Sequence, residues 1–122
     1  MVSVEQMECD NKMRAVREVQ RSPGWVSMLR MICDPESDVV WRVTLGNPEV
    51  KMSYIGYVKR HSYRTIEYSS IDKTPEWVKD RLAVLNMMPA NPNESVVRGV
   101  GRRVDQNTFW IVEPENSDGI DT

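Results

Sequence analysis

TPEWVKDRLAVLNMM, residues 74–88, is the stretch of the chain that decides the fold. Thr74 is expected to accept a hydrogen bond from the first helical turn, Pro75 suits a position that needs no donor, and Glu76 complements the helix dipole. Apolar residues then recur at spacings of three and four until Pro89 ends the pattern. The spacing predicts one principal helix with one face on a sheet. That face carries Trp77, Val78, Arg81, Leu82, Leu85 and Met88.

The residues that precede this helix predict strands, because apolar and polar residues alternate and β-branched and aromatic types are frequent. We expect four strands of an antiparallel meander, separated by short turns. Their ranges are 25–33, 39–45, 50–60 and 63–68. Gly56, inside the third strand, predicts a bulge or a close approach by another backbone.

After the helix, residues 94–104 and 108–113 predict a C-terminal β-hairpin. The expected fold class is therefore α+β: an antiparallel β meander packed by one principal helix, with a C-terminal β-hairpin. Residues 25–113 are predicted to form a single domain. Residues 1–24 are expected to form an N-terminal helix or arm, and residues 114–122 an acidic disordered tail.

Charge is unevenly distributed along the 122 residues, although the net charge is only -2. Residues 1–38 carry five basic and seven acidic side chains, residues 39–103 carry eleven and six, and residues 104–122 carry none and five. A basic centre followed by an acidic tail suggests a surface that receives anions or a tail that screens it. The favoured alternative is a set of solvated faces with a solubilising tail.

Several classes of protein are excluded by the composition. The apolar runs are shorter than the ~18 residues of a membrane span, and the N-terminus lacks the apolar core of a secretory signal, so a cytoplasmic protein is expected. Cys9 and Cys33 have no CxxC spacing and are expected to be free thiols. His61 is the single histidine, and no metal, cofactor or catalytic group is predicted. We do not expect an enzyme.

The stretch VVRGVGRR, residues 96–103, supplies the first candidate site. Arg98, Arg102 and Arg103 could clamp a phosphate or carboxylate through paired guanidinium hydrogen bonds. Strand alternation places Arg98 and Arg102 on one face and Arg103 on the other, unless a bulge at Gly99 and Gly101 rotates the register. The favoured alternative is a bent edge hairpin with solvated arginines.

A second basic cluster is expected near the turn between the third and fourth strands. Its candidate binding residues are Tyr57, Lys59, Arg60 and Arg64. Basic side chains interleaved with aromatic rings are typical of proteins that bind single-stranded nucleic acid. The sequence pI of about 5.4 is far below that of a dedicated nucleic-acid-binding domain, so this partner is not favoured.

Three segments, IDKTPEWVKDRLAVLNMM at 71–88, VVRGVGRR at 96–103 and NTFWIVE at 107–113, resemble small accessory proteins of tailed bacteriophages. The resemblance extends from about Tyr68 to Glu113 and transfers no functional residue to any position. It implies a soluble phage-encoded protein in the cytoplasm of an infected bacterium. Proteins of this kind often bind a host factor or a defence component.

These observations leave two hypotheses, both for a binding protein without catalytic activity. In the first, the chain engages or inhibits a host protein or defence component through an exposed apolar patch with a polar rim. In the second, Arg102 and Arg103 sequester a nucleotide or another phosphorylated signal in a concavity lined by aromatic rings and arginines. Assembly of a homo-oligomer could create either surface.

Overall fold

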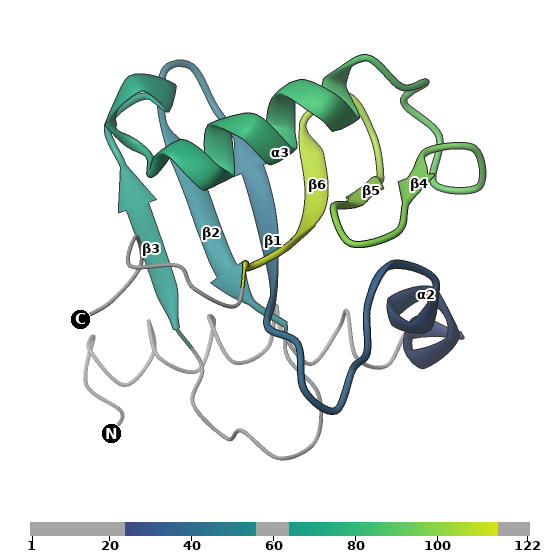
Figure 1. Cartoon of the computed structure of the whole chain (residues 1–122). Coiled ribbons are helices and arrows are strands. Elements are labelled where there is room, and N and C mark those ends of the chain that lie inside the picture. Colours follow the sequence, from purple (N-terminus) through teal and green to yellow (C-terminus); the bar gives the residue numbers. More distant parts are fainter. Residues whose placement is uncertain (1–23, 56–63, 115–122) are drawn as a thin grey trace, which may run out of the picture.

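The computed structural model describes residues 24–55 and 64–114, which form a six-stranded sheet and two α-helices (Figure 1). The predictions of a helix or arm at 1–24, of a bulge at Gly56 and of an acidic tail at 114–122 concern residues outside these ranges, apart from Gly24 and Pro114. None of the helices in the described part of the chain is long and apolar enough to cross a membrane.

All neighbouring strands of the sheet are antiparallel. Strands β1 (Val40–Leu45), β2 (Val50–Tyr54) and β3 (Thr65–Tyr68) follow one another as a meander. Strand β6 (Thr108–Val112) pairs with the other side of β1 and forms a hairpin with β5 (Gly101–Arg103), and β4 (Val96–Val97) completes the sheet. The strand order is β3-β2-β1-β6-β5-β4. This arrangement confirms the predicted α+β fold with its C-terminal hairpin.

The predicted first strand, residues 25–33, is wrong, because this segment forms helix α2 (Trp25–Ile32). Leu29, Ile32 and Cys33 are buried at helical spacing, while Met31 is 48% exposed. A short run of Met, Leu, Ile and Arg fits either periodicity, and these residue types also form helices readily. The place beside β1 that this strand was expected to fill is taken by β6.

The principal helix, α3 (Glu76–Asn86), is confirmed, and Val78, Leu82 and Leu85 are its buried residues. The capping role predicted for Thr74 is wrong. Its hydroxyl donates a hydrogen bond of 2.6 Å to the carbonyl oxygen of Ile71 and so closes the 3-10 helix η1 (Ile71–Lys73) that precedes α3. The N-cap position is occupied by Pro75.

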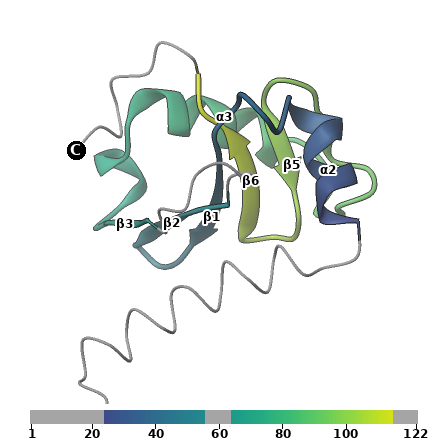
Figure 2. The same cartoon turned by 90° about the horizontal axis from the view of Figure 1, so that it is seen from below.

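Side chains of the strands alternate between two packed layers, one on each face of the sheet. Helix α3 crosses the first face, and α2 lies beside β4 on the other side of the sheet (Figures 1 and 2). The strand residues buried under α3 are Trp41, Val43, Val50, Met52, Tyr54, Phe109 and Ile111. Those that form a cluster with α2 are Val40, Trp110 and Val112 of the strands and Ile55, which follows β2.

Residues 94–104 form two short strands instead of the single strand predicted. The N–H of Val100 donates to the carbonyl of Val97 at 3.0 Å, and Gly99 turns the chain with a φ of 82°. The N–H of Gly99 also donates to the carbonyl of Ile32 at 2.8 Å, which ties the turn to the end of α2. The glycines therefore mark a bend in the chain, as the sequence predicted.

Candidate functional site

Arg103 connects the β5-β6 hairpin to the end of α3. Its Nη1 donates hydrogen bonds to the carbonyl oxygens of Asn86, at 3.1 Å, and Met88, at 2.6 Å. The last carbonyls of a helix have no partner within the helix, so a guanidinium placed there acts as a cap. The guanidinium carbon also lies 5.5 Å from the centroid of the Phe109 ring. Arg103 thus holds two elements together on the α3 face.

Arg98 lies in the turn between β4 and β5 and points toward the other helix. Its Nη1 donates to the backbone carbonyl of Arg30 in α2. Arg98 and Arg103 therefore bind the C-terminal turns of different helices on different faces of the sheet. These different contacts do not favour a clamp made by Arg98, Arg102 and Arg103 together, and anion binding by these residues stays a prediction.

Arg102 differs from both neighbours because it is 4% exposed. Its Nε and Nη1 are buried, and neither has a hydrogen-bond partner among the residues that the structure describes. Burial lowers the pKa of the guanidinium, yet an arginine keeps its charge at every physiological pH. A buried charge without a partner is costly in free energy, and proteins normally pair such groups. This side chain is the strongest candidate for a binding group.

Arg102 belongs to a row of residues that runs across the sheet on the α2 face. Trp110 is its register partner on β6, and Arg42 of β1 is the register partner of Trp110 on the opposite side. Two arginines therefore flank one indole. The row continues through Ser53 of β2 to Thr65 of β3.

Burial changes along this row. Arg102 and Trp110 are buried, whereas Arg42, Ser53 and Thr65 are half-buried. For the Arg42 side chain, no hydrogen bond or ion pair with a described residue is found. The backbone N–H of Asn107 lowers the pKa of the Asp105 carboxyl, and the charge of Arg42 adds to this effect. The more open end of the row therefore begins at Arg42.

Sequence reasoning missed Arg42, although a signal was present. In VVWRVTL, residues 39–45, Arg42 is the one charged residue of an otherwise mostly apolar strand. Alternation places it on the face opposite Trp41 and Val43, and the structure confirms this placement. The neighbours of Arg42 on that face come from β2 and β6, and the sequence did not show that β6 pairs with β1.

The second predicted cluster lies largely outside the described residues, which exclude Tyr57, Lys59 and Arg60. Arg64 is half-buried just before β3, and its carbonyl accepts a hydrogen bond of 2.9 Å from the N–H of Tyr54. Burial raises the pKa of the Tyr68 hydroxyl, and the charge of Arg64 opposes this shift. Nucleic-acid binding by this cluster stays a prediction.

A cavity of ≈ 240 Å³ opens beside α3, on the face opposite the arginine row. Among the described residues that line it there is no arginine, and the one charged residue of this set, Lys79, forms an ion pair of 3.0 Å with Glu76. The lining residues are Leu45, Ile71, Lys79, Leu82, Ala83, Asn86 and Phe109. The cavity therefore suits an apolar group.

Cys33 is a free cysteine within the described ranges. Burial, with the nearby charge of Asp38, raises the pKa of the Cys33 thiol to about 11. The thiol donates to the carbonyl of Leu29 at 3.4 Å, so Cys33 acts as a packed core residue. No group of three His, Cys, Asp or Glu side chains in residues 24–55 and 64–114 is placed to hold a metal ion.

No protein-family model matches the chain, and no curated protein or solved structure is significantly similar to it.

Proposed function

We propose that the chain is a binding protein without catalytic activity whose ligand presents a phosphate or carboxylate group to Arg102. One observation carries this proposal: Arg102 is 4% exposed as a residue, and its buried Nε and Nη1 lack partners among the described residues. An anion would supply both the opposite charge and the missing acceptors. Bound ligand would then offset the cost of burying Arg102.

Arg42 favours a ligand with more than one negative charge. Arg42 on β1 and Arg102 on β5 are the register partners of Trp110 on the two strands that flank β6. Adjacent strands are about 5 Å apart, so the Cα atoms of the two arginines are about 10 Å apart, a separation that one ligand with two anionic groups can span. A phosphorylated molecule fits better than a simple carboxylate. This is the second hypothesis from the sequence, with Arg42 in the place of Arg103.

Inorganic pyrophosphate is a suitable probe of this site. We expect it to raise the thermal midpoint of the full chain above that in sodium chloride of equal ionic strength, because binding to the folded state stabilises it. Arg102→Met should abolish this rise while keeping most of the side-chain volume. Arg30→Ala, which removes an exposed arginine of α2, is the matched control and should keep the rise. A parent protein that does not respond to pyrophosphate contradicts the proposal.

The ligand-free stability of the same variant gives an independent test. Arg102→Met replaces a buried charge that has no partner among the described residues by an apolar chain, so it should increase the free energy of unfolding in anion-poor buffer by about 1–3 kcal/mol. If Arg102 instead had a structural role like that of Arg103, the substitution would destabilise the protein. Chemical denaturation distinguishes the two results by sign.

A protein partner is the second candidate, and the apolar cavity beside α3 favours it. The occupant would be an apolar side chain of a host protein or defence component, inserted beside Ala83 and Ile71. Affinity capture from bacterial lysate should then recover a protein that Ala83→Glu loses, because this substitution places a charge at the cavity. Capture that is equal with parent and variant would exclude the cavity as the docking site.

A further inference from the structure

Strand β3 forms one outer edge of the sheet and carries polar backbone groups that no described residue satisfies. The N–H of Tyr54 donates to the carbonyl of Arg64, so Arg64 turns its backbone groups toward β2. In an antiparallel ladder, residues whose backbone groups face the neighbouring strand alternate with residues whose backbone groups face away. The N–H and C=O groups of Ile66 and Tyr68 therefore also face β2. The N–H and C=O groups of Thr65 and Glu67 point away from the sheet.

We propose that this edge pairs with the same edge of a second copy of the chain. The strands would run antiparallel about a two-fold axis beside Ile66, with Thr65 opposite the partner's Glu67. Each such pair can exchange both of its N–H···O=C bonds, because these residues are the ones whose backbone groups face outward. The two sheets would then be continuous across the dimer.

The side chains on the α3 face complement one another in this register. Ile66 would lie against the partner's Ile66, which extends the apolar layer across the axis. Arg64 would lie opposite the partner's Tyr68, where a guanidinium can contact an aromatic ring and its hydroxyl. No like charges are directly opposite on this face.

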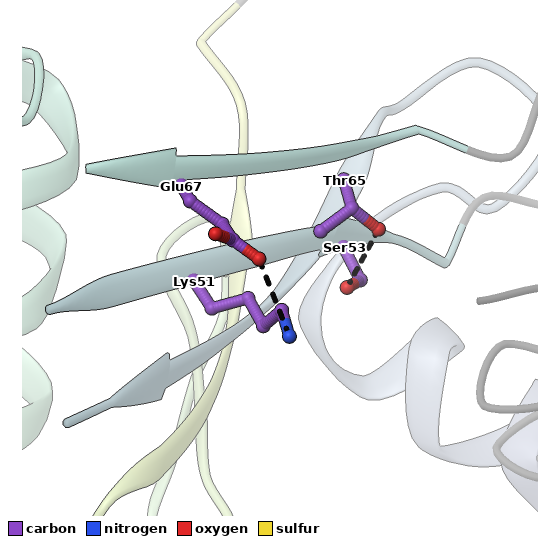
Figure 3. Close-up of polar contacts among 4 residues, drawn as sticks. All are labelled: Lys51, Ser53, Thr65 and Glu67. Carbon is purple, nitrogen blue, oxygen red and sulfur yellow. Dashed lines mark hydrogen bonds and ion pairs between the residues drawn. The ribbon is translucent and has the colours of Figure 1, made fainter. Parts of the chain in front are cut away.

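On the other face, β3 makes polar contacts with β2 (Figure 3). These contacts are also compatible with a second copy. Glu67 forms an ion pair of 3.4 Å with Lys51, and the hydroxyls of Ser53 and Thr65 are 3.4 Å apart. At the seam, Glu67 would meet the partner's Thr65, a hydroxyl donor, while Lys51 balances its charge from within the same chain. A polar row would therefore cross the interface without an unpaired charge.

The charge of Glu67 also selects this register over its neighbour. Moving the partner strand by one bonded pair in one direction would place Glu67 directly opposite the partner's Glu67, and like charges in that position are destabilising. Moving it in the other direction would place Ile66 opposite the partner's Arg64 and lose the apolar contact at the axis. A strand of an unrelated protein has no such built-in match to Arg64, Ile66 and Tyr68. The self-complementary pattern is the reason for choosing a second copy as the occupant.

Disulfide trapping in the full chain tests the register directly, on a Cys9→Ser background. Two Ile66→Cys residues would face each other across the axis with Cα atoms about 4.5 Å apart, within disulfide range. Two Glu67→Cys residues would be diagonal, about 7–8 Å apart, and should link far less readily. Oxidation should therefore give a covalent dimer of Ile66→Cys in large excess over Glu67→Cys. Equal or reversed yields overturn the proposed register.

Sedimentation equilibrium tests the association without depending on the folding of the cysteine variants. The parent should form a dimer whose fraction rises with concentration, and Glu67→Gln should do the same. Glu67→Pro should be monomeric and folded, because it removes an outward N–H that β2 does not use. A parent that is monomeric up to about 1 mM overturns the proposal, since association weaker than this is not specific. The result is independent of pyrophosphate binding.

Discussion

Gly101 packs so closely against the backbone of Trp110 that a Cβ atom at residue 101 would lie 1.9 Å from the Trp110 carbonyl oxygen. The same atom would lie 3.0 Å from the Cα atom of Ile111, and the φ of Gly101 is 151°. At residue 101, the backbone of β5 can therefore pair with β6 only if no side chain is present. Gly99, two residues earlier, has a φ of 82° with no atom within 4 Å of the Cβ position.

This difference predicts unequal effects of alanine at the two glycines. Gly101→Ala should cost more than about 4 kcal/mol or prevent folding, because the backbone of β6 would have to move. Gly99→Ala should cost only about 1–2 kcal/mol, the strain of a positive φ. Chemical denaturation of both variants measures the difference. Equal midpoints would show that Gly101 does not approach Trp110 as described.

Arg103→Met should destabilise the fold by about 1–3 kcal/mol, because it leaves carbonyl groups at the end of α3 without a donor. Arg98→Ala removes a hydrogen bond from an exposed side chain and should cost less, about 0.5–1 kcal/mol. The measurement is urea denaturation with the two variants side by side. A larger loss for Arg98→Ala would reverse the roles assigned to these arginines.

Leu85→Ala should lower the free energy of unfolding by about 2–5 kcal/mol, because Leu85 is fully buried between α3 and the sheet and the deletion leaves a void. Lys79→Ala, on the same helix, should change stability by less than about 0.5 kcal/mol, since it removes a surface ion pair. Thermal and chemical denaturation should agree. A small effect of Leu85→Ala would mean that a different face of α3 packs on the sheet.

Cys33 predicts a specific loss of stability at alkaline pH. Its pKa is raised from 9.0 to about 11 in the folded protein, so the folded state favours the protonated thiol. The contribution of the Cys33 thiol to the free energy of unfolding is therefore complete below pH 9.0 and declines as the pH rises toward about 11. Subtracting the pH profile of Cys33→Ala from that of the parent isolates this effect from other titrating groups. A difference that does not change between these pH values contradicts the burial of the thiol.

Native Cys33 should also react slowly with a thiol reagent at pH 8, because little thiolate is present and the sulfur is buried. The Cys9→Ser background leaves Cys33 as the single thiol of the chain. Reaction should become fast once urea unfolds the protein. Fast modification of the folded chain would show that α2 does not shield this residue.

The sequence predicted the elements whose signals are local. Helix α3 has an apolar stripe and a terminating proline, and β1 and β6 have the β-branched and aromatic residues of strands. The α2 segment was assigned wrongly because eight residues are too few to separate the two periodicities, and the contacts of Leu29 and Ile32 with the opposite sheet face decide its conformation.

For the candidate site too, the sequence predicted only what depends on neighbouring residues. Alternation within β5 was sufficient to place Arg102 and Arg103 on opposite faces, and the structure confirms this. It could not show that Arg103 caps α3, that Arg98 reaches α2, or that Arg42 shares a row with Arg102, because each relationship joins residues far apart in the chain. The sequence by itself determined the α+β class and the bend at the glycines, which depend on neighbouring residues. The tertiary structure alone decided which described groups each arginine contacts, because strand order and helix placement determine which carbonyl groups each guanidinium can reach.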